Sequence, residues 1–216
     1  MRVLWQCPTG ADAVLVLAHG AGAGMAHRNL QALADAFEAE RLATLRFDFP
    51  FIEAGRRRVD PPAVAIATIA SAVADAATRA SLRVWLGGHS FGGRMASHAV
   101  LDGVPAAGLI LAAFPLHAAG KPGVARAAHL DRVRQPMLFL SGTRDALARR
   151  DLLELVVATL PRAELHWLET ADHSYRTLRR SRASSESVFG EIARVTRGFI
   201  DRVTLSARPA PPAVTR

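Results

Sequence analysis

Cysteine is nearly absent from this sequence, in which Cys7 stands alone among 216 residues. A single cysteine excludes an intramolecular disulfide and a cysteine-based zinc site, and it favours a reducing compartment. The chain also lacks an apolar run long enough to span a bilayer. Its first residues, MRVLWQCPTGAD, lack the basic and apolar regions of a signal peptide. We therefore expect a cytoplasmic protein without a membrane partner.

Lysine is equally rare, because Lys121 is the only lysine among 27 basic residues, and the formal net charge is +8. A positive surface attracts polyanions. Arginine is nevertheless spread along the chain, and the two local clusters are Arg56–Arg58 and the group Arg179, Arg180 and Arg182. Short basic runs usually mark a hydrated surface. We therefore expect no nucleic-acid partner.

The composition is that of an ordinary globular protein, with 50% hydrophobic and 21% charged residues. Its length fits one domain, which we place at residues 1–205. The end of the chain, SARPAPPAVTR from Ser206 to Arg216, is rich in proline and alanine and has little to bury. We expect this tail to be disordered.

Apolar runs of strand length alternate with longer segments of helical period, which predicts an α/β fold with a mostly parallel sheet and helices on both faces. The expected strands are Ala13–Ala18, Ala43–Phe47, Val84–Leu86, Gly108–Ala112, Met137–Leu140 and Ala163–Trp167. The expected helices are Leu30–Glu40, Pro61–Arg79, Phe91–Leu101, Ala148–Leu160 and Ser185–Val203. Asp60 should cap the second helix, with Pro61 at its first position. The segment from Phe114 to Gln135 should be loop with a short helix, which is too small for a lid domain.

The strongest local motif is GGHSFGG, in which residues Gly88 to Gly92 form a G-x-S-x-G sequence centred on Ser90. A predicted strand precedes it and a predicted helix follows. This setting is typical of a nucleophile elbow, a strained turn whose flanking glycines remove side chains that would collide. The alternative is a glycine-rich turn with an incidental serine, and the strand and helix around the motif favour the elbow.

A serine hydroxyl needs a base to take its proton during attack, and the base needs a carboxylate to fix its tautomer. The chain order Ser, Asp, His predicts Asp145, after a buried strand, and His173, after the last strand. Asp145 could instead cap the following helix, whereas Asp172 is poorly placed to orient the neighbouring ring. The other histidines have simpler explanations: His89 fills the variable elbow position, His98 lies on the next helix, and His166 packs within a strand. His117 and His129 could line the pocket, but ordinary loop or helix-surface positions are favoured for them.

The transition state also needs hydrogen-bond donors for the developing oxyanion. The segment HGAGAG follows a strand and leaves backbone amides open, so we assign the donors to the amides of Ala21 and of Phe91, the residue after the nucleophile. A phosphate-binding loop is the competing interpretation, but the lysine and hydroxyl residue of a P-loop are missing. The sequence implies no cofactor and no metal.

The HG turn, GHSFGG, GTRD and ADHS occur in an order that resembles the α/β-hydrolase fold over nearly the whole chain. More narrowly, HGAGAGMAH, RFDFP, GGHSFGGRMAS, FPLH and SGTRD resemble a small, lidless hydrolase family. That family includes bacterial predicted hydrolases, testis-expressed relatives and the hydrolase-like domain of a regulatory subunit of the nonspecific-lethal complex. Dienelactone hydrolases are more distantly similar but typically use cysteine where this chain has Ser90. Asp48, within RFDFP, is interpreted as a residue that braces a loop.

Together these features predict a serine hydrolase that cleaves a small or medium ester or thioester through an acyl-enzyme. An interaction module that kept the fold and lost its chemistry is one alternative, since fold does not dictate function. A peptidase is another. The sequence leaves the oligomeric state open.

Overall fold

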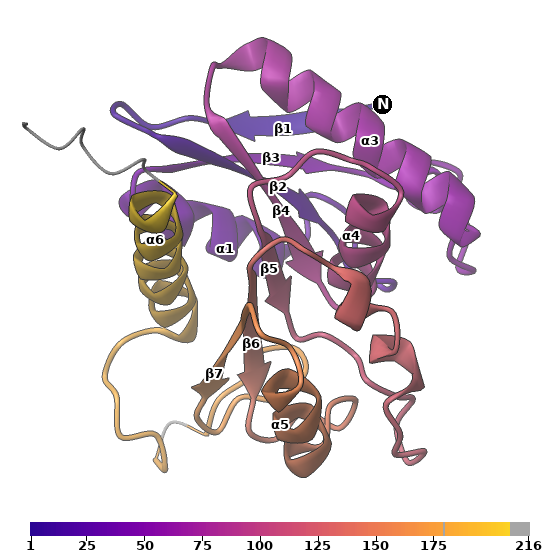
Figure 1. Ribbon diagram of the computed structural model, residues 1–216, viewed down its shortest axis with the longest axis vertical. Coiled ribbons are helices and arrows are strands. Elements are labelled where there is room, and N and C mark those ends of the chain that lie inside the picture. The colour runs from indigo at the N-terminus through magenta and orange to yellow at the C-terminus, as the bar shows by residue number, and fades with distance from the viewer. Residues whose placement is uncertain (179, 208–216) are drawn as a thin grey trace, which may run out of the picture.

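A seven-stranded sheet runs through the computed structural model, which describes residues 1–178 and 180–207, and its strand order is β1-β3-β2-β4-β5-β6-β7 (Figure 1). The edge strand β1 is antiparallel to β3, and every other described pair is parallel. The strands are β1 Val3–Gln6, β2 Ala13–Ala18, β3 Leu42–Phe47, β4 Arg83–His89, β5 Leu109–Ala112, β6 Met137–Gly142 and β7 Ala163–Leu168.

Helices cover both faces of the sheet: α1 and α6 lie on one side, and α3, α4 and α5 on the other (Figure 1). Their bounds are α1 Arg28–Ala39, α2 Pro50–Glu53, α3 Pro62–Arg79, α4 Phe91–Leu101, α5 Arg150–Ala158 and α6 Val188–Ser206. The central strands β2, β3 and β6 are buried along their whole length, as strands covered on both faces must be. The predicted fold class is therefore confirmed.

Alternation along β2 divides the core into two layers, because successive side chains of a strand point to opposite faces. Leu15 and Leu17 pack with residues of α1 and α6. Val14 and Val16 belong to the other cluster, with residues of α3 and α4. The sheet thus holds two cores apart and leaves its strand ends free to carry loops.

The short elements β1 and α2 were not predicted. The N-cap predicted for α3 was wrong. The N-cap residue of α3 is Pro61, and no side chain caps this helix. The Asp60 carboxylate turns back instead, accepts the Phe51 amide at 2.9 Å and pairs with Arg56 at 2.6 Å. Asp60 therefore binds the segment that precedes α3 and does not cap the helix.

The helix ends near the C-terminus also differ from the prediction. Helix α5 is shorter at both ends than the predicted Ala148–Leu160, and α6 lies three residues further along than the predicted Ser185–Val203. The tail expected from Ser206 begins with a helical residue, and residues 208–216 lie outside the described part of the chain.

The two arginine clusters have different environments. Arg57 and Arg58 are exposed, as expected of a hydrated surface. The Arg182 side chain is only 5% exposed and pairs with Glu191, so the prediction of a solvated position was wrong there. Arg179 lies outside the described residues.

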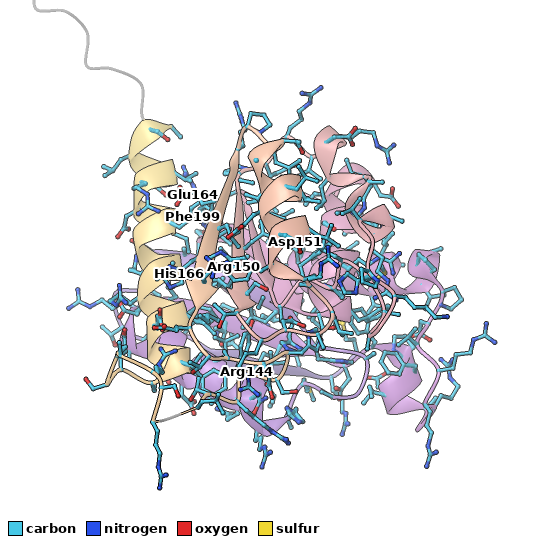
Figure 2. The ribbon with its side chains drawn as sticks, turned by 90° about the horizontal axis from the view of Figure 1, so that it is seen from below. Arg144, Arg150, Asp151, Glu164, His166 and Phe199 are labelled. Atoms are coloured by element: carbon cyan, nitrogen blue, oxygen red, sulfur yellow. The ribbon has the colours of Figure 1, made fainter. Side chains whose placement is uncertain are left out.

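Polar side chains tie β7 to α6 (Figure 2). The His166 ring donates from Nε2 to Glu191 at 2.8 Å, and Glu164 pairs with Arg202 at 2.6 Å. His166 thus has a structural partner and takes no part in the site below, as its position within a strand predicted.

The segment between β5 and β6 contains only the short 3-10 turns η1 Ala125–Ala127 and η2 Leu130–Arg132 in its described residues 113–136. It packs against α4, where the His129 ring stacks on His98 with centroids 3.7 Å apart. His117 and His129 lie in the loop, as predicted, but both are buried there. The segment has no lid. Within the described chain, no helix combines the length and apolarity that crossing a bilayer requires.

Candidate active site

Four loops meet at the carboxyl edge of the sheet, each following a parallel strand. Ala21 follows β2, Ser90 follows β4, Asp145 follows β6 and His173 follows β7. The strands β2 and β4 are hydrogen-bonded neighbours, as are β6 and β7. Because parallel strands end at the same edge, residues as far apart in the sequence as Ala21 and His173 come together there.

Ser90 lies at a sharp turn between β4 and α4, with φ 54° and ψ −115°. This is a backbone region that residues with a side chain rarely adopt. The turn runs close to β2, since a Cβ on Gly88 or on Gly92 would collide with the carbonyl oxygen of Ala18. The glycines on either side of Ser90 therefore have the steric role that the motif predicted.

The His173 ring lies between Ser90 and Asp145. Its Nε2 is 2.9 Å from Ser90 Oγ, and its Nδ1 is 2.8 Å from Asp145 Oδ2 and 3.0 Å from Oδ1. The Asp145 side chain is fully buried, whereas the His173 side chain is 23% exposed. The carboxylate fixes the tautomer in which Nδ1 donates to Asp145 and Nε2 accepts from the serine hydroxyl.

Asp145 does not cap α5, which begins at Arg150 after Arg149 as its N-cap residue. Asp145 Oδ1 instead accepts the Leu147 amide at 2.8 Å, and this bond shapes the turn that presents the carboxylate to His173. Asp172 does not contact the ring through any hydrogen bond in the described chain. Its Oδ1 accepts the amides of Ser174 and Arg176 and so stabilises the loop that carries His173.

The loop after β2 is held by His19 and Asp48. The buried His19 ring donates from Nδ1 to the Gly20 carbonyl at 2.8 Å and accepts the Phe49 amide at Nε2, 3.0 Å away. Burial lowers the pKa of His19, against the raising effects of Gly20 and Asp48. Asp48 accepts the Met25 amide at 2.7 Å, which agrees with the loop-bracing role predicted for it.

The amides of Ala21 and Phe91 are available as donors. A turn joins the Ala23 amide to the Gly20 carbonyl at 3.3 Å, and Ala21 lies at its outer part and lines the pocket. Phe91 is the first residue of α4, where an amide has no helical acceptor. Neither amide has a hydrogen-bond acceptor in the described part of the chain.

His89 belongs to the site, although its place in the elbow motif did not predict a contact. Its Nε2 donates to the His173 carbonyl oxygen at 2.8 Å, and the two rings lie 5.2 Å apart. Burial, followed by the neighbouring His173, lowers the pKa of His89 from 6.5 to about 4. His89 is therefore neutral at physiological pH and holds the loop that carries His173.

A pocket of about 330 Å³ opens beside Ser90. Ser90, His173, His89 and Ala21 line it together with residues of α1 and with Tyr175, whose pKa is raised by burial well above its ordinary value. Among the described residues, no group of three or more histidine, cysteine, aspartate or glutamate side chains could hold a metal ion.

A sequence model of a family described as an alpha/beta hydrolase domain matches residues 11–201 of this chain. That span includes every residue of the site described above. The chain belongs to this alpha/beta hydrolase family. Membership supports hydrolase activity and leaves the substrate open.

Solved structures with the same fold cover nearly all of this alpha/beta hydrolase. An alpha-beta serine hydrolase homologue from Coxiella burnetii is 19% identical with a TM-score of 0.68, over 95% of this chain and 91% of that one. A dienelactone hydrolase from Anabaena variabilis is 18% identical with a TM-score of 0.71, over 93% and 90%. Est1E from Butyrivibrio proteoclasticus is 15% identical with a TM-score of 0.69, over 94% of each chain. At these identities the likeness shows a shared fold.

Proposed function

We propose that this alpha/beta hydrolase is a serine hydrolase that cleaves esters or thioesters of small to medium size through an acyl-enzyme. The observation that carries the proposal is the continuous row of hydrogen bonds from Asp145 through His173 to Ser90. A base 2.9 Å from a hydroxyl is within reach of its proton, and a buried carboxylate stabilises the imidazolium that forms.

In the first half of the reaction, Ser90 Oγ attacks the carbonyl carbon while His173 Nε2 takes the hydroxyl proton. The carbonyl oxygen becomes an oxyanion and accepts hydrogen bonds from the amides of Ala21 and Phe91. The bond to the leaving group then breaks, and His173 returns its proton to the departing oxygen or sulfur. Water attacks the acyl-serine with His173 again as base, which releases the acid and restores Ser90.

The narrower kinship with the family that includes the hydrolase-like domain of the nonspecific-lethal complex subunit is also our proposal. The segments HGAGAGMAH and GGHSFGGRMAS, which surround Ala21 and Ser90, support it. This kinship is compatible with many acyl substrates.

The test is covalent labelling with an active-site-directed fluorophosphonate. Intact-protein mass spectrometry should detect one adduct on the native protein, and peptide mapping should locate it on Ser90. Ser90→Ala should not be labelled, and it should keep the circular dichroism of the native fold because only one oxygen is removed. A native protein that forms no adduct, or a variant that labels equally well, contradicts the proposal.

Activity on a panel of esters, thioesters, lactones and amides separates the remaining functions. Turnover of esters or thioesters that disappears in Ser90→Ala supports the proposal. The absence of turnover for every substrate in the panel favours an interaction module. Turnover confined to amides favours a peptidase.

A further inference from the structure

We propose that the pocket beside Ser90 binds an uncharged, apolar acyl group, and that Leu33 of α1 sets the length of acyl chain it accepts. This inference rests on the proposed function and specifies its substrate class.

The deeply buried part of the pocket wall on the α1 side is apolar. Leu30 and Leu33 line it and are 4% and 3% exposed, and the Tyr175 ring, 5% exposed, lies with them in the same core cluster. Side chains this deeply buried offer their methyl groups or ring faces to whatever fills the pocket. Burying apolar acyl surface against them is favourable, at roughly 25 cal/mol for each Å² removed from water.

The described lining offers no carboxylate, ammonium or guanidinium group to pair with a charged substrate. Among the described residues that line the pocket there is no aspartate, glutamate, lysine or arginine. Two of its histidines are buried, and burial lowers their pKa values: His19 accepts the Phe49 amide at Nε2, and the pKa of His89 is lowered to about 4. A carboxylate on an acyl chain packed against Leu30 and Leu33 would lose its hydration, and the described lining holds no lysine or arginine to pair with it, which is unfavourable.

The acyl substituent and the leaving group are attached to the same carbonyl carbon, and His173 must protonate the leaving atom, which therefore lies next to the His173 ring. Leu30 and Leu33 line the same pocket as Ser90 and Ala21. We assign this apolar wall to the acyl substituent, and a series of acetate esters with different alcohols tests the assignment against the leaving group.

Helix α1 is fixed relative to the reacting groups by a hydrogen bond to the loop that carries His173. Asn29 Nδ2 donates to the Ser174 carbonyl at 2.9 Å, next to His173 in the chain. Because this bond ties the start of α1 to the His173 loop, the distance from Ser90 to the Leu33 side chain is set by the fold. The length of acyl chain that the protein prefers should therefore change with the size of the side chain at position 33.

The first experiment compares kcat/KM for p-nitrophenyl acetate, butyrate, hexanoate and octanoate in the native protein, Leu33→Ala and Leu33→Phe. Leu33→Ala enlarges the pocket, so the kcat/KM ratio of octanoate to acetate should rise by about tenfold. Leu33→Phe narrows the pocket and should lower the kcat/KM ratio of hexanoate to acetate by a similar factor. Leu153→Ala is the matched control, because Leu153 is a fully buried leucine on α5 that does not line the pocket. This control loses a similar amount of buried side chain and should keep the native ratios.

The second experiment compares the 4-methylumbelliferyl esters of hexanoic acid and adipic acid, whose acyl chains match in length and differ by a terminal carboxylate. The neutral hexanoate should be preferred by more than about tenfold in kcat/KM. A preference for adipate, or equal rates, overturns the assignment of an uncharged acyl group.

These outcomes separate the inference from the proposed function. If the kcat/KM ratios of the longer acyl esters to acetate are equal in the native protein and both Leu33 variants, the role of Leu33 is overturned. The role is also overturned if the Leu33 variants change only the rates of acetate esters that differ in their alcohol. Fluorophosphonate labelling of Ser90 is measured in the same samples. If labelling persists while the ratios stay fixed, the inference fails and the serine hydrolase stands, and if labelling is absent the proposed function itself fails.

Discussion

Ser90 has a backbone conformation that few residues with a side chain adopt, and the residues around it maintain that conformation. Its amide donates to the Ala112 carbonyl at 2.8 Å, and its carbonyl accepts the Arg94 amide at 3.1 Å. Strain of this kind persists where the surrounding structure determines it, and it is common at functional sites. Here the strained turn directs the hydroxyl toward the His173 ring.

Asp145→Asn tests whether the carboxylate sets the tautomer of His173. An amide donates as readily as it accepts, so it favours the ring tautomer in which Nε2 carries the proton and cannot act as base. We expect kcat to fall by about 10⁴, with little change in the denaturation midpoint. Stopped-flow and steady-state ester hydrolysis give the rate, and urea denaturation gives the stability. A loss of less than tenfold contradicts the role of Asp145.

The sequence predicted the residues of the site whose chemistry is tied to an ordered motif, and it missed those that act through contacts. Ser90, Asp145 and His173 follow from the strands that precede them and from their order, and the structure brings them together. His89 gave no such signal, because its partner is a backbone carbonyl 84 residues away. Asn29 was missed for the same reason, since its bond to Ser174 spans 145 residues.

The junction of β4 and α4 depends on the close approach of α4 to β2. A Cβ on Gly92 would collide with the carbonyl oxygens of both Ala18 and His19, which are fixed in or next to a central strand. Gly92→Ala should therefore destabilise the protein by about 3 kcal/mol or prevent folding. Gly123→Ala is the control, because nothing lies within 4 Å of its added Cβ. Urea denaturation of both variants gives the comparison, and equal midpoints would contradict this packing argument.

The segment between β5 and β6 should make stability depend on pH through His129. Its Nε2 donates to Ser97 Oγ at 2.8 Å, since that hydroxyl donates to the Arg94 carbonyl at 2.7 Å. Burial, followed by the nearby His98, Arg94 and Arg132, lowers the pKa of His129 from 6.5 to about 4. The unfolded chain binds a proton below pH 6.5 while the folded chain does not, so this contribution destabilises the fold as pH falls through that window.

His129→Gln should remove that dependence, because glutamine keeps an N–H donor for Ser97 and does not titrate. Between about pH 7 and about pH 5 the native protein should lose about 2 kcal/mol more of its unfolding free energy than the variant does. Urea denaturation at the two pH values measures both losses. Identical losses in the two proteins would show that His129 is protonated in the folded state.

Elements with a strong local pattern were predicted well, and elements that depend on distant partners were not. The strand Ala13–Ala18 and the helix Phe91–Leu101 have their predicted bounds, because six consecutive apolar residues and a glycine-led helix start are local signals. The strand Val3–Gln6 has four partly buried residues and pairs with residues about 40 positions along the chain. Nothing in its own four residues reports that pairing.

Substrate size follows from the arrangement of the sheet and its loops, because the described segment 113–136 forms turns and no lid. A pocket of about 330 Å³ that opens to solvent holds little of a long acyl chain. Hydrolysis of p-nitrophenyl acetate should therefore exceed hydrolysis of the palmitate ester in kcat/KM, both measured below the aggregation limit of palmitate. A faster palmitate reaction would contradict this expectation.

The exposed turn near Gly120 lies in the one connection of the parallel strands β4 to β7 that supplies none of Ser90, Asp145 and His173. It closes through a bridge between Ala118 and Lys121, and Gly120 has φ 71°. Extra residues grafted at this tip would extend into solvent and leave the strands beneath in register. The architecture thus contains a natural insertion point, at which an engineered cover could be added to redirect this minimal enzyme toward larger substrates.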